Sequence, residues 1–223
     1  MMLVHPYITE EIVFNENIIN ILVIENQPFF AEIISDIYNQ TLRLPGRVVL
    51  SDDNIPIEIH KHMKLLTQIV PFDINERTLT SKFYSALKNI AVDEEHYYNT
   101  QEMIAKIKQY IFNLYDSFDY DLTIEDDIDI FSNLLKLFGL KFNEECLSIS
   151  EKIIEHMLAV TEFEGEKIFV FVNLKSYIPE AELEALYKTA IHHKLKLLLI
   201  ESTDRALLKH EKKLVIDNDL CEI

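Results

Sequence analysis

The chain has 223 residues, of which 48% are apolar, and only three glycines and six prolines. This composition supports a sizeable folded core and argues against an intrinsically disordered protein. The formal net charge of −17 excludes a uniformly basic surface for nucleic acid, because the average field would repel phosphates. A DNA-binding surface would have to gather its basic residues in one place, and no lysine precedes Lys61.

The N-terminal residues 1–6 have neither the basic start nor the apolar core of a secretory signal. No apolar stretch approaches the roughly 18 residues that a membrane-spanning helix requires. We therefore expect a cytoplasmic protein that does not associate with a membrane.

The first predicted elements are a strand, a helix and a second strand. Residues 18–25 form a short, mostly β-branched apolar run, which is typical of a strand buried on both faces. Pro28 suits the first turn of a helix, and apolar residues recur after it at helical spacing as far as Tyr38. A turn over residues 42–47 then leads into a strand over residues 47–51.

The middle of the chain is predicted to be helical throughout, because its apolar residues recur with the period of a helix. Ser148 and Glu151 have the spacing of a capping box, in which the hydroxyl and the carboxylate each accept a backbone hydrogen bond. The five predicted helices cover residues 60–69, 76–91, 100–118, 126–138 and 148–161.

The C-terminal part is predicted to form a βαβ unit. Residues 167–173 and 195–201 are apolar strands, and an amphipathic helix over residues 179–193 connects them. Parallel strands joined in this way need helices on both faces of their sheet. We therefore expect the N-terminal strand and helix to join the same sheet.

The order of these elements predicts a chain of two domains. The fold class is α/β, with a mostly parallel sheet in a discontinuous domain made of residues 1–58 and 162–223. An all-helical domain, residues 59–161, is inserted between the two halves of the α/β domain.

The segment of residues 116–129 is unusually acidic, with seven carboxylates in fourteen positions and no basic residue. Such density is electrostatically costly unless the carboxylates are solvated or a cation neutralises them, and calcium accepts about six to eight hard oxygen ligands. The segment is not an EF-hand, because it lacks the central glycine and has Ile130 where the bidentate glutamate belongs. Two interpretations remain open: a solvated loop whose acids cap the next helix, or a metal site.

Enzymatic functions find less support in the sequence. Residues 172–176, which include Lys175, follow a predicted strand as a nucleotide-binding loop does, but the glycines of a phosphate cradle are missing. A metal-dependent nuclease could use the acids of residues 116–129, since paired cations activate water and stabilise a leaving oxygen. No serine-hydrolase or zinc-protease motif occurs, so we expect a protein that is not an enzyme.

Several strings, in this order, resemble the Csn-two family, the accessory proteins of type II-A CRISPR spacer acquisition. None of them is a catalytic signature, so the resemblance rests on their order and spacing. Together they cover nearly the whole chain: residues 20–25 with the aromatic helix that follows, residues 69–75, residues 116–129, residues 134–142, and residues 168–173 through 197–201.

The resemblance implies an α/β domain that is distantly like P-loop ATPases, without a nucleotide site, and an inserted helical domain. It also implies a homotetrameric ring that binds Ca²⁺ through acidic loops and holds double-stranded DNA, of any sequence, in a lysine-lined hole. The ring would serve spacer acquisition beside the CRISPR integrase pair and the RNA-guided effector nuclease. A metal-dependent nuclease and a protein-interaction module of the acquisition complex remain open as alternatives.

The resemblance assigns residues of this chain to these roles. Lys136 and Lys141 lie in the matching stretch and are the leading candidates for the DNA-facing surface. Lys61, Lys64 and Lys108 are further candidates that the resemblance does not single out. Thr123 stands where relatives often have an acid. The acids that match the calcium region of the family are Asp119, Asp121, Glu125, Asp126, Asp127 and Asp129.

Overall fold

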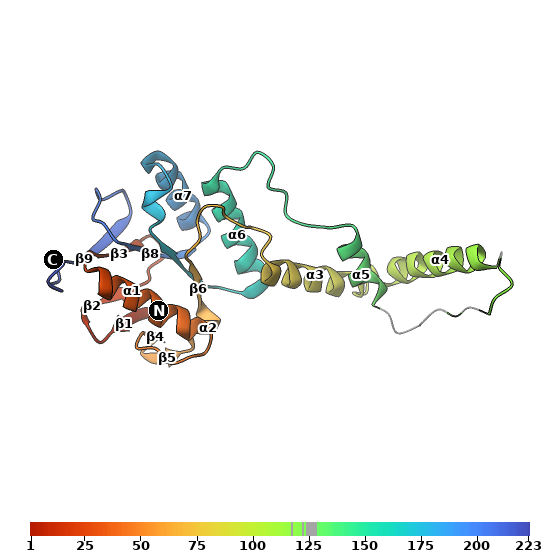
Figure 1. The fold of residues 1–223 in the computed structure, drawn as a ribbon, viewed down its shortest axis with the longest axis horizontal. Helices are drawn as coiled ribbons and strands as arrows, with labels where there is room; N and C mark the ends of the chain where they lie inside the picture. The colour runs from red at the N-terminus through yellow and green to blue at the C-terminus, as the bar shows by residue number, and fades with distance from the viewer. Residues whose placement is uncertain (117, 122, 124–128) are drawn as a thin grey trace. The chain divides into compact units, whose positions relative to one another are not determined.

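The computed structural model describes residues 1–116, 118–121, 123 and 129–223 (Figure 1). The chain divides into two compact units. The α/β unit consists of Met1–Ile74 and Glu144–Ile223, and the helical unit consists of Asn75–Asn143. Both ends of the segment 59–161 therefore belong to the α/β unit, and the inserted helical unit is shorter than the sequence predicted.

A five-stranded sheet forms the centre of the α/β unit, and its neighbouring strands all run parallel. All six residues of β3 are buried, as its mostly apolar sequence predicted, and the one polar side chain, Asn20, donates to the carbonyl of Val13. The strand predicted over residues 18–25, which is β3, joins the sheet of the C-terminal βαβ unit, as expected. In sheet order, the strands are β6 Met63–Leu66, β7 Ile168–Val172, β8 Lys196–Glu201, β3 Ile19–Ile24 and β9 Glu211–Ile216.

A second sheet is antiparallel, and the sequence predicted only its strand Val49–Asp52, as a strand over residues 47–51. The helix α1 (Gln27–Thr41) follows β3 and begins at Asn26, whose side chain accepts a hydrogen bond from the N–H of Phe29. Apolar residues of α1 and of the second sheet share one core with alternate residues of the parallel strands. In sheet order, the four strands are β2 Ile8–Val13, β1 Met2–His5, β4 Val49–Asp52 and β5 Ile55–Ile57.

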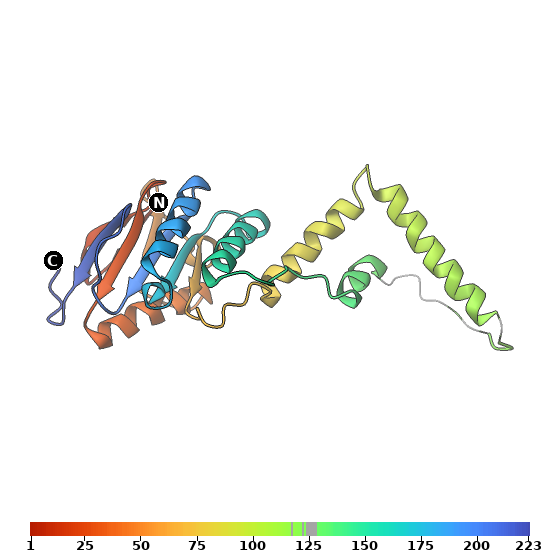
Figure 2. The ribbon, with the colours of Figure 1, turned by 90° about the horizontal axis from the view of Figure 1, so that it is seen from above.

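Two further helices, α6 (Ile149–Glu164) and α7 (Glu180–His192), contact each other and lie on the opposite side of the parallel sheet from α1 (Figure 1, Figure 2). The capping box at the start of α6 is confirmed, because Ser148 and Glu151 make both reciprocal hydrogen bonds. Helices on both faces explain why the central strands β7, β8 and β3 are almost wholly buried.

The predicted helix over residues 60–69 is wrong. The helix α2 (Ile59–His62) is a single turn, and the chain then forms β6, which pairs in parallel with β7. A short apolar run fits either period, and here strand pairing with β7 overrides the helical spacing.

The helical unit contains α3 (Arg77–Ala91), α4 (Tyr97–Tyr115) and α5 (Ile130–Leu137). Of these, α3 and α5 contact each other. Within the described residues, none of the helices is both long enough and apolar enough to cross a membrane.

Candidate nucleic-acid interface

Basic side chains gather between α3 and α5, in a pocket of about 440 Å³ that we call the α3–α5 groove. The α3 residues that line it recur at intervals of three and four, so they form one face of the helix that is about 16 Å long. Among the described residues, three cations face one carboxylate here, so the described lining is positive on a chain of net charge −17. The lining residues are Arg77, Thr80, Ser81, Tyr84, Ser85, Lys88, Asp129, Ser132 and Lys136.

The segment that follows α5 is tied to α3 by hydrogen bonds. The Asn75 side chain donates to the carbonyl of Phe142 at 3.1 Å and accepts from its N–H at 2.8 Å. The hydroxyl of Tyr84 donates to the carbonyl of Leu140 at 2.7 Å. These contacts hold the exposed Lys141 close to α3, within the same unit as the groove.

The three cations of the groove differ in their partners. Arg77 and Lys136 are exposed and have no ion-pair partner among the described residues. The ammonium of Lys88 lies 2.5 Å from Oδ2 of Asp129, and the two side chains are 47% and 42% exposed. The hydrogen bond from Lys88, followed by that from Ser132, holds the pKa of Asp129 below its ordinary value.

The other lysines predicted to face DNA lie elsewhere. Lys61, in α2, pairs with Glu58, and Lys64, in β6, is 18% exposed and pairs with Glu164. Both lysines belong to the α/β unit. Lys108 lies on α4 and does not line the groove. Of the five predicted lysines, the groove contains Lys136 and the segment tied to α3 contains Lys141.

The acids predicted to bind calcium are partly described. Residues 125–127 lie outside the described residues. Asp119 and Asp121 are exposed, and Asp129 uses its carboxylate to cap α5 and to pair with Lys88. In the part of the chain that the structure describes, no three His, Cys, Asp or Glu side chains are grouped to hold a metal ion. The calcium ligand set therefore stays a prediction.

The lysine of the loop considered for nucleotide binding is buried in the α/β unit. Lys175 lies in the 3-10 helix η1 (Leu174–Ser176), directly after β7, and its ammonium contacts Glu211 at 2.8 Å. The two side chains are 4% and 0% exposed, and the hydroxyl of Tyr187 donates to the same carboxylate at 2.8 Å. Because the ammonium of Lys175 is paired with Glu211, it is not available to bind the phosphate of a nucleotide.

A second buried carboxylate gives this part of the fold a pH dependence. Glu201, at the end of β8, is 1% exposed and accepts the N–H of Lys175 at 3.0 Å. Burial raises the pKa of Glu201 from 4.5 to about 7. In the unfolded chain the carboxyl of Glu201 ionises near pH 4.5. The free energy of unfolding therefore falls as the pH rises from 4.5 to about 7, because the folded protein must then hold a buried negative charge.

Replacing Glu201 with glutamine is therefore expected to raise the free energy of unfolding by about 3 kcal/mol at pH 8 and by less than about 0.5 kcal/mol at pH 4.5. Glutamine keeps an oxygen for the Lys175 N–H and carries no charge at either pH. Urea unfolding of both proteins at the two pH values measures the difference. An equal effect at both values would contradict the raised pKa of Glu201.

Comparisons with known proteins agree with this fold. Residues 44–220 match the family described as CRISPR-associated protein (Cas_Csn2). A CRISPR-associated protein Csn2 from Enterococcus faecalis is 23% identical over 139 residues, which cover 61% of this chain and 62% of that protein. Another, from Streptococcus agalactiae, is 23% identical over 180 residues, or 80% of this chain and 78% of that protein. The match thus spans less than two thirds of the length of the Enterococcus protein and more than two thirds of the length of the Streptococcus protein.

A solved structure has the same fold at low sequence identity. The crystal structure of Stu0660 of Streptococcus thermophilus matches 96% of this chain and 74% of its own, with a TM-score of 0.59 and 11% identity. This likeness agrees with the α/β fold that the sequence predicted. Because the family match spans most of the chain, this protein belongs to the Cas_Csn2 family of CRISPR-associated proteins.

Proposed function

We propose that this protein is a non-catalytic, calcium-dependent ring that binds double-stranded DNA of any sequence during the acquisition of new CRISPR spacers. The observation that carries the proposal is the α3–α5 groove, which is positive although the chain carries a net charge of −17. Membership of a CRISPR-associated family supports the setting. The ring would act beside the CRISPR integrase pair and the RNA-guided effector nuclease.

Contacts to DNA phosphates would supply most of the affinity. Arg77 and Lys136 have no ion-pair partner among the described residues, and both line the groove. A guanidinium can donate two parallel hydrogen bonds to one phosphate, and a lysine ammonium attracts phosphate as a point charge. Such contacts do not distinguish one base sequence from another, and they weaken steeply as salt concentration rises.

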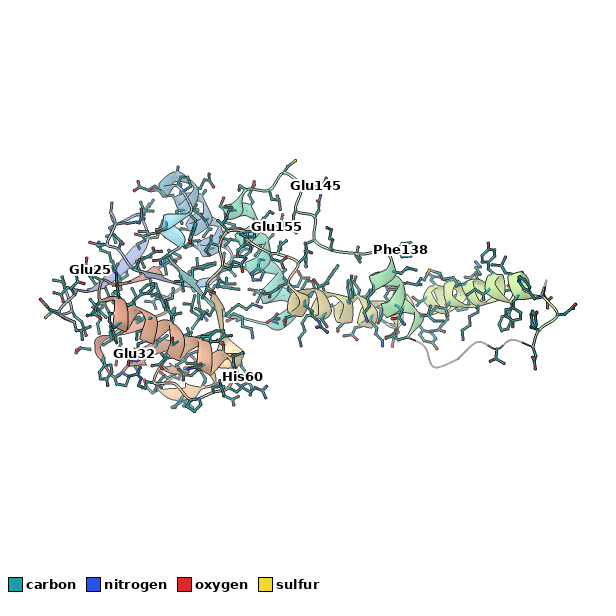
Figure 3. The ribbon with its side chains drawn as sticks, viewed as in Figure 1. Glu25, Glu32, His60, Phe138, Glu145 and Glu155 are labelled. Carbon is teal, nitrogen blue, oxygen red and sulfur yellow. The ribbon has the colours of Figure 1, made fainter. Side chains whose placement is uncertain are left out.

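Exposed apolar side chains on the helical unit support the association of several copies. Helix α4 has one buried residue, Thr100, and Phe138, which follows α5, is 80% exposed (Figure 3). Exposed apolar side chains of this kind mark a surface that another protein can cover. We propose a homotetramer, which would gather the grooves of its copies around one duplex and so concentrate positive potential. The large apolar residues of α4 that are at least 42% exposed are Tyr97, Tyr98, Met103, Tyr110, Ile111, Phe112 and Leu114.

Calcium would neutralise the other acids of the segment 116–129, whose carboxylates repel one another and any nearby DNA, whereas Asp129 is paired with Lys88. Replacing Asp126 and Asp127 with alanine is expected to lower the melting temperature in calcium by about 5–10 °C, at a calcium concentration about a hundred times the Kd. In chelator the melting temperature should not fall. Differential scanning calorimetry measures the melting temperature in both conditions. An unchanged melting temperature in calcium would contradict the assignment of Asp126 and Asp127 as calcium ligands.

A gel shift tests the proposed function with linear and covalently closed duplex DNA, in calcium or in chelator, at about 100 mM salt. A closed protein ring can load only at free DNA ends, so we expect calcium-dependent binding of the linear form without cleavage. Degradation of the DNA would instead indicate the metal-dependent nuclease. Absence of any shift would favour a protein-interaction module that recruits other acquisition proteins.

A further inference from the structure

We infer that Lys88 is a third phosphate ligand of the α3–α5 groove, and that Asp129 occupies its ammonium until a DNA phosphate replaces the carboxylate. The inference rests on the proposed DNA binding and adds a residue and a means of regulation to the same site. It follows from the place of Lys88 on α3, from the exposure of its ion pair and from the second role of Asp129.

The position of Lys88 suits a phosphate contact. Arg77 and Lys88 line the groove from the same face of α3, about three turns apart, with Ser81 and Ser85 between them. Lys136 lines it from α5. A DNA strand that runs along the groove would therefore pass all three cations, with Arg77 and Lys88 near different phosphates. Among the described residues, Lys88 is the one cation of this groove that has an acidic partner.

The ion pair of Lys88 is of a kind that exchanges readily. Its side chains are 47% and 42% exposed, and ion pairs screened by water to this extent contribute little net stability. A phosphate that enters the groove offers Lys88 an equivalent oxygen ligand and is also attracted by Arg77 and Lys136. Asp129 opposes this step in two ways, because it occupies the ammonium of Lys88 and its charge repels the phosphate.

The ion pair between Asp129 and Lys88 can break while Asp129 keeps its position at the start of α5. Its Oδ1 accepts the N–H of Ser132 at 3.2 Å, and its Oδ2 accepts the Ser132 hydroxyl at 2.8 Å, which caps the start of α5. The carboxylate therefore keeps these hydrogen bonds after the exchange. Asparagine caps helices about as well as aspartate, so Asp129→Asn removes the charge and retains the cap.

Four proteins test the inference in saturating calcium: the wild type, Asp129→Asn, Lys88→Gln and the double variant. Affinity for a linear duplex is measured at about 100 mM salt. We expect Asp129→Asn to tighten binding about three- to tenfold, because a competing charge is gone. Lys88→Gln should weaken binding and make the dependence of log K on log salt shallower by about 0.9 for each copy that contacts DNA. In the Lys88→Gln background, most of the gain from Asp129→Asn should disappear.

A matched control comes from α4, where Glu102 and Lys106 form another exposed ion pair. Glu102→Gln removes the same charge outside the groove, and its effect on affinity should be smaller than that of Asp129→Asn. An equal gain from Asp129→Asn with and without Lys88 would overturn the inference, since Asp129 would then act only by repulsion. Weaker binding by Asp129→Asn would also overturn it, whereas a wild type that does not bind DNA would refute the proposed function itself.

Discussion

Replacing Lys175 with alanine is expected to lower the free energy of unfolding by about 3–5 kcal/mol, because it leaves a buried carboxylate without its counter-charge. Glu211 is 0% exposed at its side chain. The hydroxyl of Tyr187 and the N–H of Leu208 would still donate to this carboxylate, each at 2.8 Å, but neither carries a positive charge. Urea unfolding at pH 7 measures the loss.

Two variants separate this effect from the mere loss of a lysine. Lys194 pairs with Glu16 on the surface, where the side chains are 69% and 59% exposed, so Lys194→Ala should cost less than about 1 kcal/mol. Replacing Lys175 with methionine and Glu211 with leucine together removes both charges and should recover most of the lost stability. A loss of under about 1 kcal/mol for Lys175→Ala would contradict the claim that Lys175 is the group that stabilises the charge of Glu211.

Removing the two cations of the α3–α5 groove that have no ion-pair partner among the described residues is expected to weaken DNA binding by about 10- to 100-fold at 100 mM salt. The variant is Arg77→Gln with Lys136→Gln. Each phosphate contact adds about 0.9 to the slope of log K against log salt, so the slope should become shallower by about 2 for each copy that contacts DNA. Fluorescence anisotropy over a range of salt concentrations measures both quantities.

Lys82 supplies a control on the same helix. It is exposed on α3 but does not line the groove, and Lys82→Gln changes the net charge by one unit without touching the groove. Its effect on affinity and on the salt slope should be small. The groove is not the DNA-binding surface if the double variant Arg77→Gln with Lys136→Gln keeps its affinity for DNA. The same conclusion follows if Lys82→Gln loses as much DNA affinity per charge removed as the double variant does.

The elements that could be predicted from the sequence are those with an unambiguous period or a clear cap. β3 is a mostly apolar run buried on both faces, and α6 begins at a capping box. β6 could not be predicted, because its four residues become a strand only by pairing with β7, which follows about a hundred residues later. Of the antiparallel sheet, only β4 was predicted, as a strand over residues 47–51. β1, β2 and β5 were missed because they are short, and β2 and β5 lack a regular alternation of buried and exposed positions.

The candidate interface could be predicted only in part. Lys136 and Lys141 were identified through the family resemblance, and the structure places Lys136 in the groove. Arg77 and Lys88 were not predicted to contact DNA. A basic residue on an amphipathic helix usually faces solvent, and the neighbouring sequence does not show which other helix packs beside it. The spacing of Arg77, Ser81 and Lys88 on one helix face was the available signal, and its importance depends on the packing of α5 against α3.

The central claim is that the protein binds duplex DNA through phosphate contacts. Its most direct test is the affinity of the wild type, in calcium, for two linear duplexes of the same length and unrelated sequence, over about 50–200 mM salt. We predict equal affinities for the two duplexes and a linear fall of log K with log salt. No binding at the lowest salt, or an affinity that differs between the sequences and is indifferent to salt, would contradict the claim.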